Sequence, residues 1–169
     1  YSRVRARSFA GAATTVLAID PTYTLAALTE SAALTFTGVQ ISSITLQWSA
    51  GDNPAGTEFR AQASTAASFS GTILSSDWST AVSTGFNSLA VNTSYYFRSQ
   101  ARNSLIIETP YTLFGATFTL AAVPAASTIS TSNPSGLTVE WSANSNPPGT
   151  RYEAQVGTST TFLPVAQAS

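Results

Sequence analysis

The stretch that decides the fold is residues 44–61, which read ITLQWSAGDNPAGTEFRA. Apolar and polar side chains alternate in its first residues, and they alternate again after a run of Gly, Asp, Asn and Pro. Alternation with a period of two is typical of a half-buried β-strand, and Gly, Asn and Pro favour turns. The stretch therefore predicts two strands joined by a turn, with Trp48 and Phe59 on the buried face.

The same pattern returns 93 residues later, where residues 137–154 read LTVEWSANSNPPGTRYEA. A second match, at an offset of 95, relates YSRVRARS at the start of the chain to YFRSQARN at residues 96–103. The offsets differ because the later copy is two residues shorter between the matched segments. The chain is thus built from a repeat of about 94 residues, which is long for a solenoid repeat and typical of a β-sandwich domain.

Composition excludes several classes of function. The chain has 169 residues, of which 9% are charged, with a net charge of -1, no His and no Cys. These absences remove the commonest catalytic base, the usual nucleophile–base pairs and almost all zinc or iron–sulfur chemistry. The lack of a basic run argues against nucleic acid or a membrane surface, and no apolar run approaches the roughly 20 residues of a membrane-spanning helix. We therefore expect no enzyme activity, cofactor, metal, nucleic-acid partner or membrane insertion.

Together these residues resemble the fibronectin type III family. Trp48 stands where that family has its core tryptophan, and Leu89, Thr93 and Tyr95 fit its later pattern. There Tyr95 would be the tyrosine corner, with a buried ring and a hydroxyl bonded to upstream backbone. Ser99 departs from the pattern, which normally has Val there. The resemblance implies an all-β fold of tandem fibronectin type III-like, immunoglobulin-like β-sandwiches, whose structural core includes Trp48, Trp141, Tyr95, Leu89, Phe59 and Tyr152.

The resemblance divides the chain into one complete and two partial domains. Residues 1–28 correspond to the last two strands (F and G) of one sandwich, residues 29–122 to a complete sandwich, and residues 123–169 to the first half (strands A, B and C) of another. A half-sandwich would leave an apolar face and strand edges open. The chain is therefore either a window on a longer tandem array, or its partial domains are completed by neighbouring chains. We favour the window, since a neighbour would still lack an equivalent of residues 77–95.

Three groups of side chains are candidate binding sites. Outward arginines could form an anion patch, although cross-strand pairing with residues such as Glu58 is the reading that we favour; they are Arg3, Arg5, Arg7, Arg98 and Arg102. Aromatic residues could stack on sugars if exposed, but more often fill a core or a junction; they are Tyr23, Trp78, Tyr111 and Phe114. Asp52 and Glu58 offer too few carboxylates for calcium, and the matching loop does not repeat a glycosidase pair.

Covalent glycans are the remaining chemistry that the sequence suggests. Asn92-Thr93-Ser94 is the one glycosylation sequon not blocked by Pro, and 25 Ser and 25 Thr offer sites for O-linked sugar. A surface this poor in charge falls below the roughly 25–35% charged residues that keep designed proteins soluble. Glycan, or burial of the surface in a fibre, would compensate, so we predict Asn92 as a glycosylation candidate.

The Asn-Pro-x-Gly-Thr loop resembles in particular the repeats of long bacterial surface proteins. That likeness implies a structural repeat segment of an extracellular or cell-surface filament, stalk or giant surface protein, glycosylated, and able to polymerise if neighbouring chains complete its partial domains. Its partners would be copies of itself, adjacent domains of the same long chain, or polysaccharide. The alternative is a spacer or carbohydrate-binding accessory module of a secreted polysaccharide-degrading enzyme. An Arg-Gly-Asp adhesion tripeptide is absent.

Overall fold

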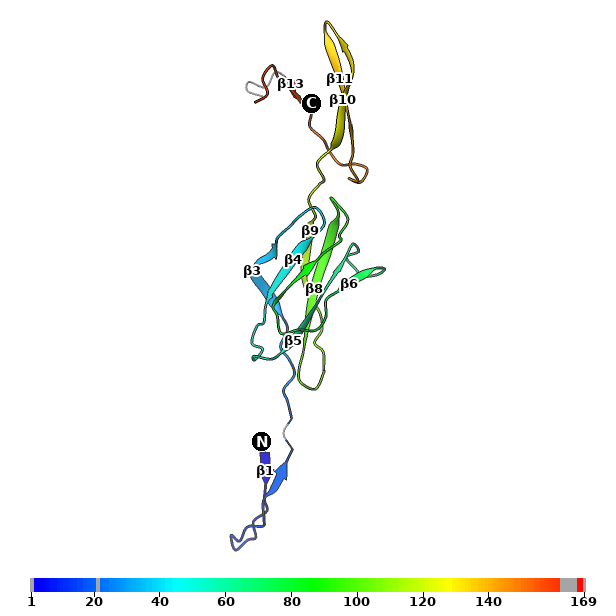
Figure 1. The fold of residues 1–169 in the computed structure, drawn as a ribbon. Helices are drawn as coiled ribbons and strands as arrows, with labels where there is room; N and C mark the ends of the chain where they lie inside the picture. Colours follow the sequence, from blue (N-terminus) through cyan, green and yellow to red (C-terminus); the bar gives the residue numbers. More distant parts are fainter. Residues whose placement is uncertain (1, 21, 162–166, 169) are drawn as a thin grey trace.

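The computed structural model describes residues 2–20, 22–161 and 167–168. Within these ranges every regular element is a β-strand, and the strands form three groups along the chain (Figure 1). A short hairpin lies near the N-terminus, a two-sheet domain occupies the middle, and two further hairpins lie towards the C-terminus. No segment of the described chain forms a helix with the length and hydrophobicity needed to cross a bilayer.

The middle domain is a sandwich of two antiparallel sheets. One sheet has the order β3-β4-β7, made of Glu30–Thr37, Ile44–Ser49 and Ser83–Phe86. The other has the order β6-β5-β8-β9, made of Ile73–Ser75, Glu58–Ser64, Ser94–Arg102 and Thr112–Phe118. These are the A-B-E and C′-C-F-G sheets of a fibronectin type III-like sandwich, the fold that the sequence predicts.

The core lies between the two sheets and follows the alternation in the sequence. Along β4 the buried residues are Ile44, Leu46 and Trp48, with half-buried polar residues between them. Phe59 opens β5 with its ring 6.3 Å from that of Trp48, in an edge-on arrangement. The structure buries four of the residues predicted as structural core, namely Trp48, Phe59, Leu89 and Tyr95.

Tyr95 forms the tyrosine corner. Its ring is buried, and its hydroxyl accepts a hydrogen bond from the backbone N–H of Ala90 at 2.9 Å. This bond ties the loop after β7 to β8, so it joins strands of opposite sheets. The loop turns sharply, since Ser88 and Asn92 both have positive φ.

Ser99, the departure from the family pattern, has partners in the core. Its hydroxyl lies 2.7 Å from the Thr29 hydroxyl, and both residues are buried. Thr112 on β9 donates from its own hydroxyl to the Thr29 carbonyl at 2.9 Å. Because a buried hydroxyl is costly unless it is hydrogen-bonded, Ser99 is stable there only with Thr29 in place.

The N-terminal hairpin repeats the register of the middle domain. β1 (Ser2–Val4) pairs with β2 (Leu17–Ile19), so that Arg3 faces Ala18 and Val4 faces Leu17. At an offset of 95, the corresponding pairs Arg98–Leu113 and Ser99–Thr112 join β8 to β9. The N-terminal hairpin therefore has the same pairing as β8 and β9, although among the described residues it forms a sheet of two strands alone.

The C-terminal part repeats the first four strands of the middle domain. β10 (Ala125–Asn133) pairs with β11 (Gly136–Ser142) as β3 pairs with β4. β12 (Gln155–Val156) pairs with β13 (Gln167–Ala168) in the register of β5 and β6. The predicted half-domain ended at the third strand, whereas the structure adds β13, a counterpart of β6.

Trp141 and Tyr152 depart from their prediction as core residues. Their rings pack at 5.9 Å, as those of Trp48 and Phe59 pack in the middle domain, but Trp141 remains 38% exposed. The described chain places no counterpart of β8 and β9 over this pair. The residues have formed their local contact without a core around it.

Candidate functional site

The loop between the second and third strands clamps the linker that enters the middle domain. Asn53 donates from Nδ2 to the carbonyls of Ala27 at 2.8 Å and Ala50 at 2.7 Å. Its Oδ1 accepts from the N–H of Ala27 at 2.8 Å. One side chain thus satisfies both backbone groups of a linker residue and joins them to the end of β4.

The same clamp recurs at the next junction. Asn146, which follows Asn53 by 93 residues, donates to the carbonyls of Ala122 at 2.7 Å and Ala143 at 2.8 Å. It accepts from the Ala122 N–H at 2.8 Å, and it is buried. Asn53 and Asn146 therefore form the same three hydrogen bonds although different strands surround them. We infer that the clamp is a feature of the repeated unit.

The second linker is also tied to the domain that it leaves. Thr119 is buried, and its hydroxyl donates to the Ala90 carbonyl at 2.6 Å and accepts from the Thr93 N–H at 3.0 Å. The backbone N–H of Leu120 donates to the backbone carbonyl of Gln40 at 3.0 Å. Since Ala122 is already held by Asn146, the backbone is bonded on both sides of Ala121. Little of the linker is left to act as a hinge.

A direct contact joins the two units across this linker. Asn92 donates from Nδ2 to the Thr150 hydroxyl at 2.9 Å, and Thr150 donates onward to the Pro147 carbonyl. Asn144 also donates to the linker, at the Val123 carbonyl. Asn92, the predicted glycan acceptor, is half-buried in the left-handed region with a φ of 44°. Sequence reasoning missed its contact because 58 residues separate the partners.

At the opposite end of the middle domain, a small groove lies beside the first linker. It has a volume of about 150 Å³ and is lined by residues of the linker, of the Asn53 loop and of the β8–β9 loop, including Tyr23, Thr57 and Asn103. Asn103 donates to the Thr24 carbonyl at 3.1 Å. Tyr23, on this linker, is exposed.

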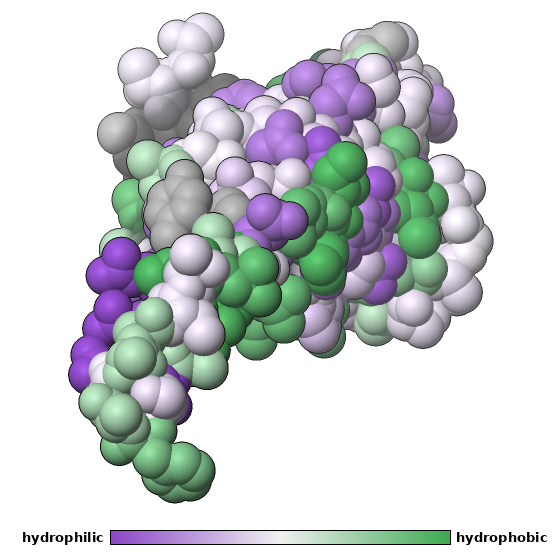
Figure 2. Space-filling model, turned by 90° about the horizontal axis from the view of Figure 1, so that it is seen from below, coloured by the Kyte–Doolittle hydropathy of each residue, from purple (hydrophilic) through white to green (hydrophobic). Residues whose placement is uncertain are grey.

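Apolar side chains gather near this end of the molecule. Figure 2 shows it from below, with hydrophobic patches between polar ones. The exposed residues include Leu105, Ile106 and Ile107 of the β8–β9 loop. Ile106 has a φ of 63°, a strained conformation for a β-branched residue, whereas the equivalent position in the first unit is Gly11 with a φ of 84°.

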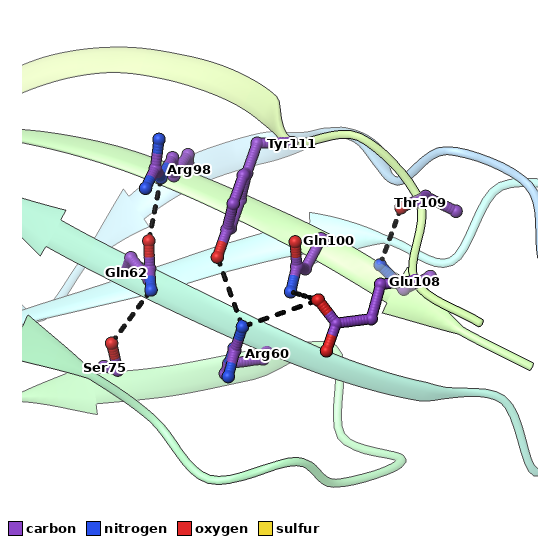
Figure 3. Close-up of polar contacts among 9 residues, drawn as sticks. Arg60, Gln62, Ser75, Arg98, Gln100, Glu108, Thr109 and Tyr111 are labelled. Atoms are coloured by element: carbon purple, nitrogen blue, oxygen red, sulfur yellow. Dashed lines mark hydrogen bonds and ion pairs between the residues drawn. The ribbon is translucent and has the colours of Figure 1, made fainter. Parts of the chain in front are cut away.

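The outer face of the four-stranded sheet carries a layer of arginine and aromatic side chains (Figure 3). The Arg98 guanidinium lies 3.8 Å from the ring centroid of Tyr111 and 4.1 Å from that of Phe69. Arg60 and Arg102 both lie over Trp78, at 4.8 and 4.4 Å. Such contacts contribute about 0.5–1 kcal/mol each at exposed sites.

Polar bonds complete this layer. Arg102 pairs with Glu58 at 2.7 Å, and these residues lie directly opposite each other on β8 and β5. Arg98 donates to Gln62 at 2.8 Å, and Gln100 donates to Glu108 at 2.8 Å (Figure 3). The layer covers Gln62 and Gln100 so well that both outward-facing residues are buried. Arg98 and Arg102 are therefore engaged in cross-strand contacts, the reading that we favour for the outward arginines. Arg3, Arg5 and Arg7 of the N-terminal hairpin are exposed, so the structure does not bring the five predicted arginines into one site.

The candidate sugar-stacking residues are not assembled into one surface. Trp78 and Tyr111 each have arginine over the ring, and Phe114 packs against the core. Tyr23 is exposed on the first linker, at the small groove. Among the described residues there is no group of three or more His, Cys, Asp or Glu side chains placed to hold a metal ion.

Comparisons with known proteins yield little beyond the architecture. No family model matches the chain, and no curated protein matches it. Among solved structures, a fibronectin type III domain derived from the human KIAA0970 protein is similar, with 18% identity and a TM-score of 0.40. The match covers 64% of this chain and 84% of that domain. The fold assignment rests on the strand order and pairing of the middle domain.

Proposed function

We propose that this chain is a structural segment of tandem β-sandwiches that acts as a stiff spacer in an extracellular or cell-surface filament, stalk or giant surface protein. The observation that supports this most directly is the linker clamp, which Asn53 and Asn146 form with the same partners at successive junctions. A repeated clamp favours a repeated angle between units. Length would then increase in proportion to the number of units.

The physical basis of the stiffness is the density of bonds around each linker. Residues 119, 120, 122 and 123 all have backbone or side-chain partners in the adjoining loops. Pro124 further restricts the residue before it to extended conformations. Bending at this junction must break several hydrogen bonds at once, whereas a Gly/Ser-rich linker would bend freely.

Location and glycosylation are part of the proposal. Many Ser and Thr residues of β10 and β11 are exposed, and the chain carries few charges that could keep such a surface soluble. Sugar on these hydroxyls would supply the missing solvation, as expected for a bacterial-type surface glycoprotein. Glycosylation of Asn92 stays a prediction, and a glycan there would have to displace the hydrogen bond to Thr150.

The linker is the place to test the proposal. In the intact chain, backbone ¹⁵N relaxation of residues 120–123 should give order parameters near 0.85, the value typical of rigid backbone. Asn146→Ala should lower these towards the flexible range, below about 0.6, and speed amide exchange at Ala122. Asn87→Ala, at an exposed asparagine of the loop after β7, is the matched control. Flexible linker amides in the unaltered chain would contradict the spacer role.

A further inference from the structure

Two matching side-chain pairs join β5 and β8 on the outer face of the four-stranded sheet. Arg102 lies directly opposite Glu58, and Arg98 lies directly opposite Gln62. In both pairs the arginine Nε donates to a side-chain oxygen of its partner, at 2.7 Å for Glu58 and 2.8 Å for Gln62. The two pairs therefore have the same geometry and differ in charge, since one acceptor is a carboxylate and the other is a neutral amide.

The neutral acceptor leaves the charge of Arg98 uncompensated. Arg102 forms an ion pair with Glu58, and Arg60 lies 3.7 Å from an oxygen of Glu108. Among the described residues, Arg98 has no acidic partner, and its terminal nitrogens Nη1 and Nη2 have no hydrogen-bond acceptor. Neither nitrogen is buried, so both are accessible to a ligand from solvent.

Four side chains hold the Arg98 guanidinium in place. The ring centroids of Tyr111 and Phe69 lie 3.8 and 4.1 Å from its Cζ. Gln62 is itself fixed, because its Nε2 donates to the Ser75 hydroxyl at 3.0 Å (Figure 3). The entropy that an arginine loses on binding a ligand has thus been lost largely on folding. The groups left free are the terminal N–H groups, which suit two oxygens of a carboxylate or a sulfate.

The repeat keeps the neutral pair and not the acidic one. At an offset of 93, Gln62 returns as Gln155, whereas Glu58 returns as an arginine. At an offset of 95, Arg98 matches Arg3. A pair that served stability alone would be stronger with Glu, because a charge-assisted hydrogen bond is roughly twice as strong as a neutral one. Gln at this position orients the arginine and leaves its charge available.

We propose that Arg98 is the centre of an anion-binding site, and that its ligand is a carboxylate or sulfate group of an acidic polysaccharide. Each unit with the Gln–Arg pair offers one such charge, so the sites recur at intervals of one unit. A long polyanion can contact successive sites, and linked weak contacts give a much higher overall affinity. Leu113, directly opposite Arg98 on β9, is 65% exposed and offers an apolar contact to a sugar ring. The site would bind whether or not the linkers are stiff, so it is independent of the spacer function.

An acidic side chain of a second copy would offer the same chemistry. The chain has only eight Asp and Glu residues, and Glu58 and Glu108 already lie beside arginine. An acidic polysaccharide carries charge along its whole length, and so it matches a charge that is repeated once in every unit. The polysaccharide is therefore the ligand that the repeat favours.

Titration of the intact chain tests the site. The probes are oligogalacturonate, which carries carboxylates, and dextran sulfate, which carries sulfate esters, with neutral dextran as the control. The Arg98 Nε–H signal in ¹H–¹⁵N spectra should shift with at least one of the two polyanions and not with dextran, and added salt should weaken the binding. A chain that binds neither polyanion, or that binds free acetate or sulfate as tightly, would overturn the polysaccharide ligand.

Substitutions in the two pairs separate the charge from the fold. Gln62→Glu keeps Arg98 and an acceptor for its Nε but adds the missing carboxylate. It should weaken polyanion binding by more than about five-fold, the upper limit for an exposed ion pair. Glu58→Gln makes the Arg102 pair like that of Arg98, and should strengthen binding by about two-fold or more because it adds a second uncompensated cation.

Arg98→Lys provides a second test that leaves position 62 unchanged. It keeps the positive charge but loses the planar fork that binds two oxygens, so binding should weaken here as well. Unchanged affinity in folded Gln62→Glu and Arg98→Lys chains would overturn the site. Self-association without polysaccharide, abolished by Gln62→Glu, would show instead that the ligand is an acidic side chain of a second copy. Rigid linker amides in a chain that binds no anion would leave the spacer function intact.

Discussion

Trp48 and Trp141 occupy the same position in two copies of one repeat, yet one is 3% exposed and the other 38%. Each ends the second strand of its unit, and each packs on the aromatic residue that opens the third, Phe59 or Tyr152. The strand and the aromatic pair form in both copies. Only Trp48 lies under β8 and β9, strands that begin 46 or more residues later in the chain.

The difference separates local from long-range determinants of this fold. Alternation and turn residues are sufficient to form β10–β11 with the pairing of β3–β4. Burial requires a second sheet, and that sheet comes from strands distant in sequence. A unit of this repeat is therefore stable as a whole, while its pieces keep their hairpins and expose their apolar faces.

The largest expected effect tests this contrast at the two tryptophans. Trp48→Ala should destabilise the middle domain by about 3–5 kcal/mol, the cost of removing a large buried aromatic side chain. Trp141→Ala should change the same unfolding transition by no more than about 0.5 kcal/mol, as for a surface substitution. Urea denaturation followed by circular dichroism would measure both. Equal destabilisation would show that the third unit has a core of its own.

A smaller effect is expected at the tyrosine corner. Tyr95→Phe keeps the buried ring but removes the hydroxyl that accepts from Ala90, which should cost about 1–2 kcal/mol. Tyr96→Phe, on the adjacent and more exposed residue, is the control and should be close to neutral. The comparison uses the same unfolding curves, and a neutral Tyr95→Phe would mean that the corner is dispensable in this domain.

The smallest expected effect concerns the outer face of the sheet. A double-mutant cycle on Glu58→Gln and Arg102→Gln should give a coupling energy of about 0.2–1 kcal/mol that decreases at high salt. The pair is partly exposed, so water screens it. A coupling energy that does not respond to salt would indicate that stacking of Arg102 on Trp78, which does not involve Glu58, had been disturbed instead.

Much of the fold was predictable because its signals are local or repeated. The alternation around Trp48 and the Leu89–Tyr95 pattern predict the strands, the buried face and the tyrosine corner of the middle domain. The junction contacts were not predictable. Asn53 reads as an ordinary turn residue, and its partner Ala27 lies 26 residues earlier with a featureless side chain, because the bonds involve its backbone. The sequence marks Asn92 as a glycan acceptor, but nothing in it indicates the hydrogen bond from Asn92 to Thr150.

By itself the sequence determined the repeat, the hairpins and their registers, since turn chemistry and period-two alternation act over a few residues. The tertiary structure decided which copies of those patterns become a core, because burial needs two sheets to meet face to face. It also decided that Asn53 and Asn146 hold linkers and that Ser99 has a buried partner in Thr29. Hydrogen bonds to distant backbone or side chains leave no pattern in the sequence, and they exist only once the chain has brought those groups together.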